Sequence, residues 1–139
     1  HSIDLVFIEE AALLHDIGIF LTDAPAIGCT GHQPYLAHGY LGRELLEQEG
    51  LPRHALVCER HIGVGLSREE VIEQSLPLPE RDMIPITLEE QIITYADLFF
   101  SKADPHGTEE RTYELVRRKM GRYGARKVEQ IDYWHNLFS

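Results

Sequence analysis

The sequence predicts an all-α fold that forms one domain over residues 1–139. Apolar residues recur at steps of three and four in one segment after another, which is the period of an amphipathic helix. No segment keeps the alternation of apolar and polar residues that a half-buried strand shows. No internal repeat and no low-complexity linker divides the chain. We therefore expect a bundle of about six to seven helices.

The first predicted helix covers residues 3–17 and ends at Gly18. Its second half, Ala11-Ala12-Leu13-Leu14, is apolar on all sides, which is typical of a buried helix. Residues 18–34 are rich in Gly, Thr, Asp and Pro and are predicted to form a long loop. A loop of this length in a small domain is usually functional or mobile.

The remaining helices are predicted from periodicity and from start and stop signals. They cover residues 35–49, 53–62, 67–76, 88–102, 111–123 and 125–138. Ser67 with Glu70, and Thr87 with Glu90, are two candidate capping boxes, and Thr108 precedes the charged helix of residues 111–123. Residues 8–103 carry the motifs described below, and we expect the helices of residues 108–138 to pack on that part.

Composition and charge exclude several classes of protein. Asp and Glu number 23 and Lys and Arg 13, so the net charge of −10 disfavours binding to a long nucleic acid. No apolar run approaches the roughly 20 residues of a membrane span. Cys29 and Cys58 are too few for a disulfide framework, so a reducing cytoplasm is the expected compartment.

A His-Asp pair lies in the most apolar predicted helix of the protein. Burying His15 and Asp16 there without partners would cost several kcal/mol or shift their pKa values. A divalent cation would compensate, because imidazole and carboxylate are common metal ligands. A His-Asp pair satisfied by backbone and neighbouring bases is the structural alternative.

Three further residues change the balance between these alternatives. His38 shares a helix face with Leu41 and Leu45, and His61 ends the next helix. Asp97 lies within an apolar stretch. The intervals 16 to 38, 38 to 61 and 61 to 97 are 22, 23 and 36 residues, each about one helix and a connection. We therefore expect these groups to converge from four helices on one point.

The ordered set resembles the HD-domain superfamily of metal-dependent phosphohydrolases. His15-Asp16-Ile17-Gly18 is similar to the family's dyad in its HDIG form. The segment His38-Gly39-Tyr40-Leu41-Gly42-Arg43-Glu44-Leu45-Leu46 resembles the family's second-helix pattern of His, Gly and an aliphatic run. His61 and Ala96-Asp97 complete the set. The resemblance covers residues 8–103 and implies an HD-domain-like helical bundle.

The resemblance also implies a metal site and a reaction. His15, Asp16 and Asp97 would hold a first divalent ion, and Asp16 would bridge to a second ion held by His38 and His61. Fe, Mn, Zn, Ni and Co suit such ligands, and Mg stays an alternative. The expected function is hydrolysis of a small phosphoester or nucleotide by metal-activated water, without a covalent phosphoenzyme. The choice among phosphomonoesterase, phosphodiesterase and nucleotide pyrophosphohydrolase stays open.

One departure from the family pattern concerns the first metal ligand. In the family this histidine lies on a helix upstream of the dyad, whereas only fourteen residues precede His15. Either that helix is absent from this sequence, or His1 is itself the ligand.

Three further side chains are candidates for contact with an anionic substrate. Arg60, beside His61, and Lys102, after Asp97, are predicted to bind the phosphate, and Lys102 is also a catalytic candidate. His32 in the long loop is a candidate proton donor to the leaving group, beside Asp16 as the central catalytic residue.

Two non-catalytic functions stay open as alternatives. One is a structural zinc site, because Cys29-x-x-His32 and Cys58-x-x-His61 have zinc-ligand spacing. The other is a degenerate HD protein that senses a ligand without turnover. A third alternative is a partner-binding role for the last helices, whose aromatic residues would form an exposed stripe or instead cap the core. A homo-oligomer would fit the same stripe. These residues are Tyr113, Tyr123, Tyr133, Trp134 and Phe138.

Overall fold

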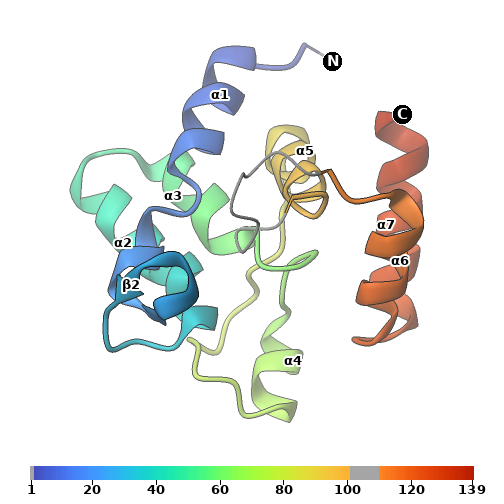
Figure 1. Ribbon diagram of the computed structural model, residues 1–139. Helices are drawn as coiled ribbons and strands as arrows, with labels where there is room; N and C mark the ends of the chain where they lie inside the picture. The colour runs from blue at the N-terminus through green and yellow to red at the C-terminus, as the bar shows by residue number, and fades with distance from the viewer. Residues whose placement is uncertain (1, 101–109) are drawn as a thin grey trace.

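The structure is a computed structural model that describes residues 2–100 and 110–139. This part of the chain holds seven α-helices, short 3-10 turns and one two-stranded sheet, which confirms the all-α prediction (Figure 1). The α-helices are α1 (Leu5–Leu14), α2 (His38–Gln48), α3 (Pro52–Arg60), α4 (Arg68–Glu73), α5 (Leu88–Asp97), α6 (Tyr113–Gly121) and α7 (Ala125–Phe138). The 3-10 turns are η1 (Ile17–Leu21), η2 (Pro25–Ile27) and η3 (Tyr35–Ala37).

Two packed layers meet at α5. On one side α1, α3 and α5 enclose a cluster of four buried apolar residues, Phe7, Ala11, Val57 and Ile93. On the other side α7 packs against α5, and α6 packs against α7 (Figure 1). This second cluster is centred on Val116, Ile131 and Trp134. The indole Nε1 of Trp134 donates to Oε1 of Gln91 at 3.0 Å, which ties α7 to α5.

The aromatic residues of the last helices differ in how far they are buried. Trp134 is buried, so this member of the predicted stripe belongs to the core. Tyr123 and Tyr133 are exposed, with 71% and 59% of their surface accessible. Tyr113 stacks on His135 with ring centroids 3.8 Å apart.

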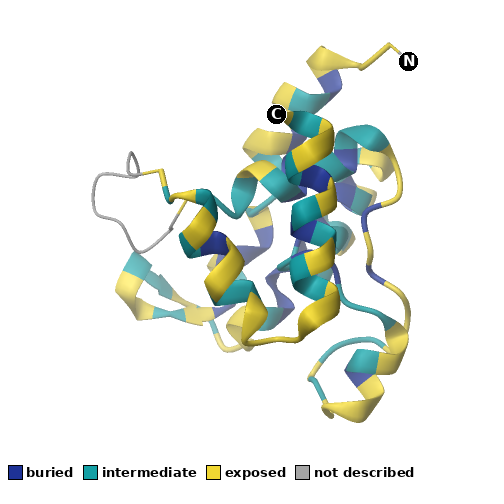
Figure 2. Cartoon of the chain, turned by 90° about the vertical axis from the view of Figure 1, so that its right-hand side faces the viewer, coloured by how far each residue is buried: buried dark blue, intermediate teal, exposed yellow. Residues whose placement is uncertain are grey.

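The prediction that the first helix is buried on all sides is wrong. Only Phe7 and Ala11 of α1 are buried, and Leu13 is 86% exposed. The helix next to the N-terminus is mostly coloured as exposed or intermediate in Figure 2. The helix faces α3 and α5 on one side, and no described element covers the other. A helix that is apolar all round has no periodicity to indicate which face packs.

The predicted loop of residues 18–34 contains ordered backbone. After η1, strands β1 (Asp23–Ala24) and β2 (Cys29–Thr30) pair in antiparallel register on either side of η2. Gly28 ends η2 with a φ of +80°, which a glycine adopts without strain. Two-residue strands are too short to show alternation in a sequence, so this hairpin was not predictable from periodicity.

Several helix ends also differ from the predictions. Helix α5 ends at Asp97 rather than at residue 102, and α6 begins after Thr112, whose side chain accepts from the Leu115 amide. The predicted cap Thr108 lies outside the described residues. The Ser67 box forms in full. At Thr87 only half of the box forms, because the Glu90 carboxylate accepts from the Ile86 amide instead.

Within residues 2–100 and 110–139, no helix has both the length and the apolar character that spanning a lipid bilayer requires.

Candidate metal centre

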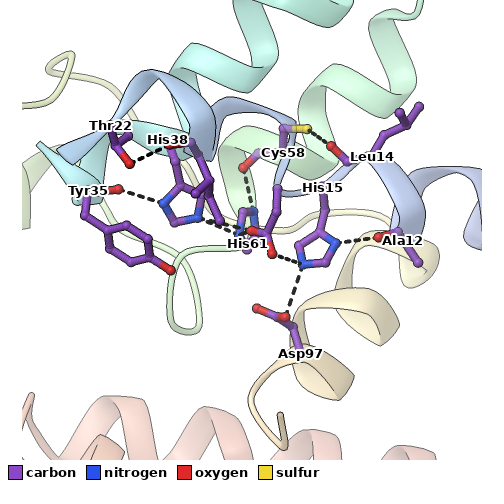
Figure 3. Close-up of polar contacts among 11 residues, drawn as sticks. Ala12, Leu14, His15, Thr22, Tyr35, His38, Cys58, His61 and Asp97 are labelled. Carbon is purple, nitrogen blue, oxygen red and sulfur yellow. Dashed lines mark hydrogen bonds and ion pairs between the residues drawn. The ribbon is translucent and has the colours of Figure 1, made fainter. Parts of the chain in front are cut away.

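The five residues predicted as metal ligands lie together at one point of the fold (Figure 3). His15 Nε2 is 3.1 Å from Asp16 Oδ2 and 3.1 Å from Asp97 Oδ1. Asp16 Oδ1 is 3.3 Å from His38 Nε2 and 3.2 Å from His61 Nε2. One imidazole nitrogen thus contacts both carboxylates, and one carboxylate oxygen contacts both remaining imidazoles.

Helix ends position these side chains. His15 caps the C-terminus of α1, and His61 caps the C-terminus of α3. His38 is the first residue of α2, and Asp97 is the last residue of α5. Asp16 follows in the turn between α1 and η1. The helix fixes the backbone of a residue at its end. Helices that end near one another can therefore direct such side chains at a common point.

Close backbone packing explains why these helix ends meet. A Cβ atom on Gly18 would lie 2.2 Å from the His38 carbonyl oxygen and 2.6 Å from the Gly42 nitrogen, so η1 rests directly on α2. A Cβ on Gly39 would lie 2.9 Å from the Cys58 carbonyl oxygen, so α2 also rests directly on α3. These contacts bring the backbone that carries Asp16 beside the helices that carry His38 and His61.

Backbone carbonyls fix the orientation of all three imidazoles. Nδ1 of His15, His38 and His61 donates to the carbonyl oxygen three residues earlier, at 2.6, 2.7 and 2.7 Å. In a neutral imidazole the nitrogen that faces a carbonyl oxygen carries the hydrogen, so Nε2 presents a lone pair. Such a bond to a backbone carbonyl is the usual outer partner of a metal-ligating histidine.

The arrangement of His38 and His61 fits a cation. Their Nε2 atoms face each other at 3.1 Å (Figure 3). Both also lie within 3.3 Å of Asp16 Oδ1. Two lone pairs and a carboxylate oxygen directed at one point repel one another unless a positive charge lies among them. Two overlapping sets of donors, each within 4.8 Å, could hold a metal ion: His15, His61 and Asp97, and Asp16, His38 and His61. HD domains bind divalent metals, and this donor set fits them.

The pKa values of the clustered residues shift in different directions. Burial lowers the pKa of His15, but its hydrogen bonds to Asp16 and Asp97 outweigh burial and raise that pKa to about 10. Burial raises the pKa of Asp16, and the hydrogen bonds from the three histidines hold it well below its usual range. Burial lowers the pKa of His61 despite its bond to Asp16. Without metal, therefore, His15 is cationic and His61 neutral at neutral pH.

Metal binding is accordingly expected to release a proton. A metal-ligating imidazole is neutral, whereas metal-free His15 with a pKa of about 10 is protonated at neutral pH. Affinity should therefore rise by about tenfold per pH unit from about pH 7 to pH 9. Calorimetric titration with Mn²⁺ in buffers of different ionisation enthalpy should show about one proton released, and close to none for His15→Ala. Equal heats in all buffers would contradict this protonation state.

The predicted substrate-binding residues lie elsewhere or outside the described residues. Arg60 Nη1 donates to Glu90 Oε1 at 2.8 Å, which joins α3 to α5. His32 is exposed beyond β2 and belongs to neither donor set. His1 and Lys102 lie outside the described residues.

The Cys₂His₂ zinc site does not form. Cys58 Sγ donates to the Leu14 carbonyl oxygen at 3.2 Å and packs with Leu46 and Ala55. Its sulfur is turned away from His61 (Figure 3), and burial with the charge of Asp16 raises the pKa of the thiol to about 12. Neither cysteine belongs to a donor set within the described residues.

Two features of the centre were not singled out from the sequence. The ring of Tyr35 lies 4.7 Å from that of His38, and its carbonyl accepts the Nδ1 hydrogen of the same histidine. Gly39 and Gly42, one turn apart on α2, were quoted in the second-helix pattern, but the close packing that they allow was not predicted. The spacing of small residues beside His38 was the signal in the sequence that could have indicated this close packing. Gly18, which also takes part in it, was interpreted from the sequence as a helix end.

Comparison with known proteins shows which relatives and which family the chain is similar to. The chain is 40% identical over 98 residues to an uncharacterized protein of Methanocaldococcus jannaschii, covering 70% of this chain and 50% of that protein. It is 34% identical over 99 residues to a tRNA (cytidine(56)-2'-O)-methyltransferase of Thermoplasma volcanium, covering 70% of this chain and 25% of that enzyme. A protein of the same name from Picrophilus torridus is 35% identical over 95 residues, which cover 68% of this chain and 24% of that enzyme.

The chain thus spans half or less of the length of these relatives. No solved structure matches it. The profile of the HD domain matches residues 2–101, which include all five clustered histidines and aspartates. The chain therefore belongs to the HD domain family.

Proposed function

We propose that this domain is a metal-dependent phosphohydrolase that acts on a small phosphoester or a nucleotide. The observation that carries the proposal is the convergence of three imidazole Nε2 atoms and two carboxylates on one point. Mixed nitrogen and oxygen ligands of this kind are typical of hydrolytic metal centres. The HD domain match supports a hydrolytic class of activity.

Charge explains why a metal would be needed. The protein has a net charge of −10, and the centre itself contains Asp16 and Asp97. A phosphate would be repelled from such a site without added positive charge. Divalent ions held there would supply that charge and would lower the pKa of a water molecule toward neutrality. His38 and His61 would hold their Nε2 lone pairs in place through the carbonyl bonds of Nδ1.

The side chains beside the centre favour water as the nucleophile. The Cys58 thiol is turned to the Leu14 carbonyl, and its pKa of about 12 keeps it protonated. The Thr22 hydroxyl donates to the Ile19 carbonyl oxygen at 2.7 Å. Both groups thus donate to a backbone carbonyl and not to a base that would generate a nucleophile. These contacts support direct hydrolysis without a phosphoenzyme.

Three side chains outside the donor sets are the candidates for contact with the substrate. Arg60 is engaged by Glu90, so a role in phosphate binding would require that this ion pair open. Lys102 stays our proposed phosphate-contacting residue, and His32 our proposed proton donor. The chemistry fits a small substrate, because no basic stripe balances the net charge of −10 along a polymer.

The test combines metal analysis with a substrate panel. Purified protein would be analysed for bound metal and assayed with phosphorylated metabolites and nucleotides in Mn²⁺, Fe²⁺, Ni²⁺ and Co²⁺. We expect metal-dependent release of phosphate, with one oxygen-18 atom incorporated from labelled water. Activity after complete chelation would overturn the metal requirement. A phosphorylated side chain trapped by rapid quench would overturn direct hydrolysis, and bound metal without turnover on the whole panel would favour the sensor alternative.

A further inference from the structure

Positive charge is concentrated in one short segment of this acidic protein. Residues 111–127 hold seven of the 13 lysines and arginines and one of the 23 acidic residues, which gives them a net charge of +6. The other 122 residues hold six basic and 22 acidic residues, a net charge of −16. A polyanion is therefore attracted to this segment, although the chain as a whole repels it.

The fold presents this segment on the C-terminal helices. It includes α6 and the start of α7, which lie on the side of α5 away from α1 and α3 (Figure 1). Residues 121–126, which contain the turn between the two helices, are all exposed. Figure 2 looks onto this side of the molecule, and the turn has the colour of exposed residues there. The turn and its side chains are thus open to solvent.

Three of the seven basic side chains are already engaged within the protein. Arg117 contacts Asp132 at 3.0 and 3.2 Å, and Lys127 Nζ lies 2.6 Å from Glu70 Oε1. Arg111 donates to a backbone carbonyl oxygen at 3.2 Å. The other four form no ion pair with any residue that the structure describes, and we call them the basic patch: Arg118, Lys119, Arg122 and Arg126.

The residues of the basic patch lie close together. Arg118 and Arg122 are four residues apart and Lys119 and Arg122 three apart, so they share one side of α6 and its end. Arg126 follows in the first turn of α7. Like charges at this spacing repel one another, so the basic patch lowers stability as long as no counter-charge is bound. A negatively charged partner would remove this repulsion.

An exposed aromatic ring stands within the basic patch. Tyr123 lies between Arg122 and Arg126 in the sequence, and 71% of its surface is accessible. Bases of single-stranded nucleic acids stack on exposed rings of this kind, and guanidinium groups beside them bind the phosphates. The tyrosine therefore adds a flat stacking surface to the charge of the basic patch.

Two other classes of anionic partner fit the basic patch less well. A lipid surface requires apolar side chains that enter the membrane beside the basic ones. The large apolar side chains exposed on residues 113–138 are Tyr123, Tyr133 and Leu137, and of these only Tyr123 lies in the patch. An acidic segment of a protein would match the charge but would provide no flat group for the ring.

We propose that the basic patch binds a short single-stranded stretch of nucleic acid, with phosphates on the arginines and one base stacked on Tyr123. The nine residues of α6 span about 14 Å, which limits the contact to a short stretch. The nucleic acid is a partner here and not the molecule that is hydrolysed. The inference therefore does not depend on the proposed function, and a small substrate at the metal centre is compatible with it.

The charge contribution is tested by fluorescence anisotropy with a short labelled oligouridine RNA and the corresponding oligothymidine DNA. We expect binding at low ionic strength that weakens steeply as salt is added. Arg122→Gln should weaken binding at every salt concentration and reduce the slope of log Kd against log salt by about 0.7, the share of one phosphate. Arg53→Gln removes the same charge from an exposed side chain of α3 and should change neither quantity.

The ring is tested separately from the charges. Tyr123→Ala should weaken binding about five- to hundredfold, the range for loss of one stacked base, and leave the salt slope unchanged. Tyr133→Ala removes a comparably exposed tyrosine of α7 that lies outside the basic patch, and the affinity should stay the same. Circular dichroism would check that all four variants are folded, as expected for substitutions of exposed residues.

Controls separate this inference from the proposed function and from other partners. The titrations would be repeated with EDTA, because EDTA would release a nucleic acid held by bound metal and not one held by the basic patch. Binding that survives EDTA in a protein without phosphohydrolase activity would overturn the proposed function alone. Loss of binding in EDTA, equal affinity in Arg122→Gln and Arg53→Gln, or binding indifferent to Tyr123 would overturn the patch assignment. So would the absence of binding, or tighter binding of phosphatidylserine vesicles or polyglutamate than of either oligonucleotide.

Discussion

Replacing Asp16 by asparagine is expected to remove both bound metal and turnover. One oxygen of this carboxylate contacts His38 and His61, and the other contacts His15. Asparagine keeps the shape but loses the negative charge and one acceptor oxygen. Loss of even an outer partner of a metal ligand typically costs about 10- to 100-fold, so we expect kcat/KM to fall more than about a hundredfold. Metal analysis and the phosphate-release assay would measure both effects.

Two comparison variants make this result specific. Asp23→Asn removes the same charge from an exposed residue of β1 and should leave metal content and turnover unchanged. His38→Ala distinguishes one ion from two, because His38 belongs to only one of the two donor sets. With two ions it should remove about half of the metal and most of the activity. Full activity in Asp16→Asn would place the reaction at another site.

The candidate centre could be predicted from the sequence because its residues stand beside local signals, such as helix ends and apolar stretches. His61 precedes a glycine break, and Asp97 lies in an apolar stretch where an unpartnered carboxylate is costly. Buried polar residues on successive helices therefore indicated a common partner. Arg60 illustrates the limit of this reasoning. Its neighbour His61 faces the centre, but Arg60 is directed to Glu90 by the helical rotation between adjacent residues, and nothing local in the sequence indicated that partner.

The parts of the fold that were not predicted depend on contacts between distant segments. Leu13 is apolar and yet exposed, because burial depends on which elements pack on α1 and not on the composition of α1 itself. The contact between Met120 of α6 and the turn at Gly63 likewise joins segments that lie far apart in the sequence. Helical periodicity gives the buried face of each helix, but not the identity of its neighbour.

Gly18→Ala is expected to damage both stability and the metal centre, although it adds only a methyl group. That methyl carbon would lie 2.2 Å from the His38 carbonyl oxygen and 2.6 Å from the Gly42 nitrogen, both backbone atoms of α2. Helix backbone cannot move aside as a flexible side chain does, so η1 must shift away from α2. Overpacking of this kind costs about 1–3 kcal/mol in unfolding free energy, which corresponds to a fall of several degrees in melting temperature.

The effect on turnover should exceed the effect on stability. A shift of η1 moves Asp16, two residues earlier, relative to His38 and His61, and a displacement of about 1 Å in a reacting site can cost about a hundredfold in rate. Gly121→Ala is the matched control, because its Cβ would meet only Val128 Cγ2, at an ordinary 3.6 Å. That variant should keep the parent melting temperature, or exceed it slightly, with full activity. If Gly18→Ala behaved like Gly121→Ala in both measurements, close packing of η1 on α2 would not be what holds Asp16 at the centre.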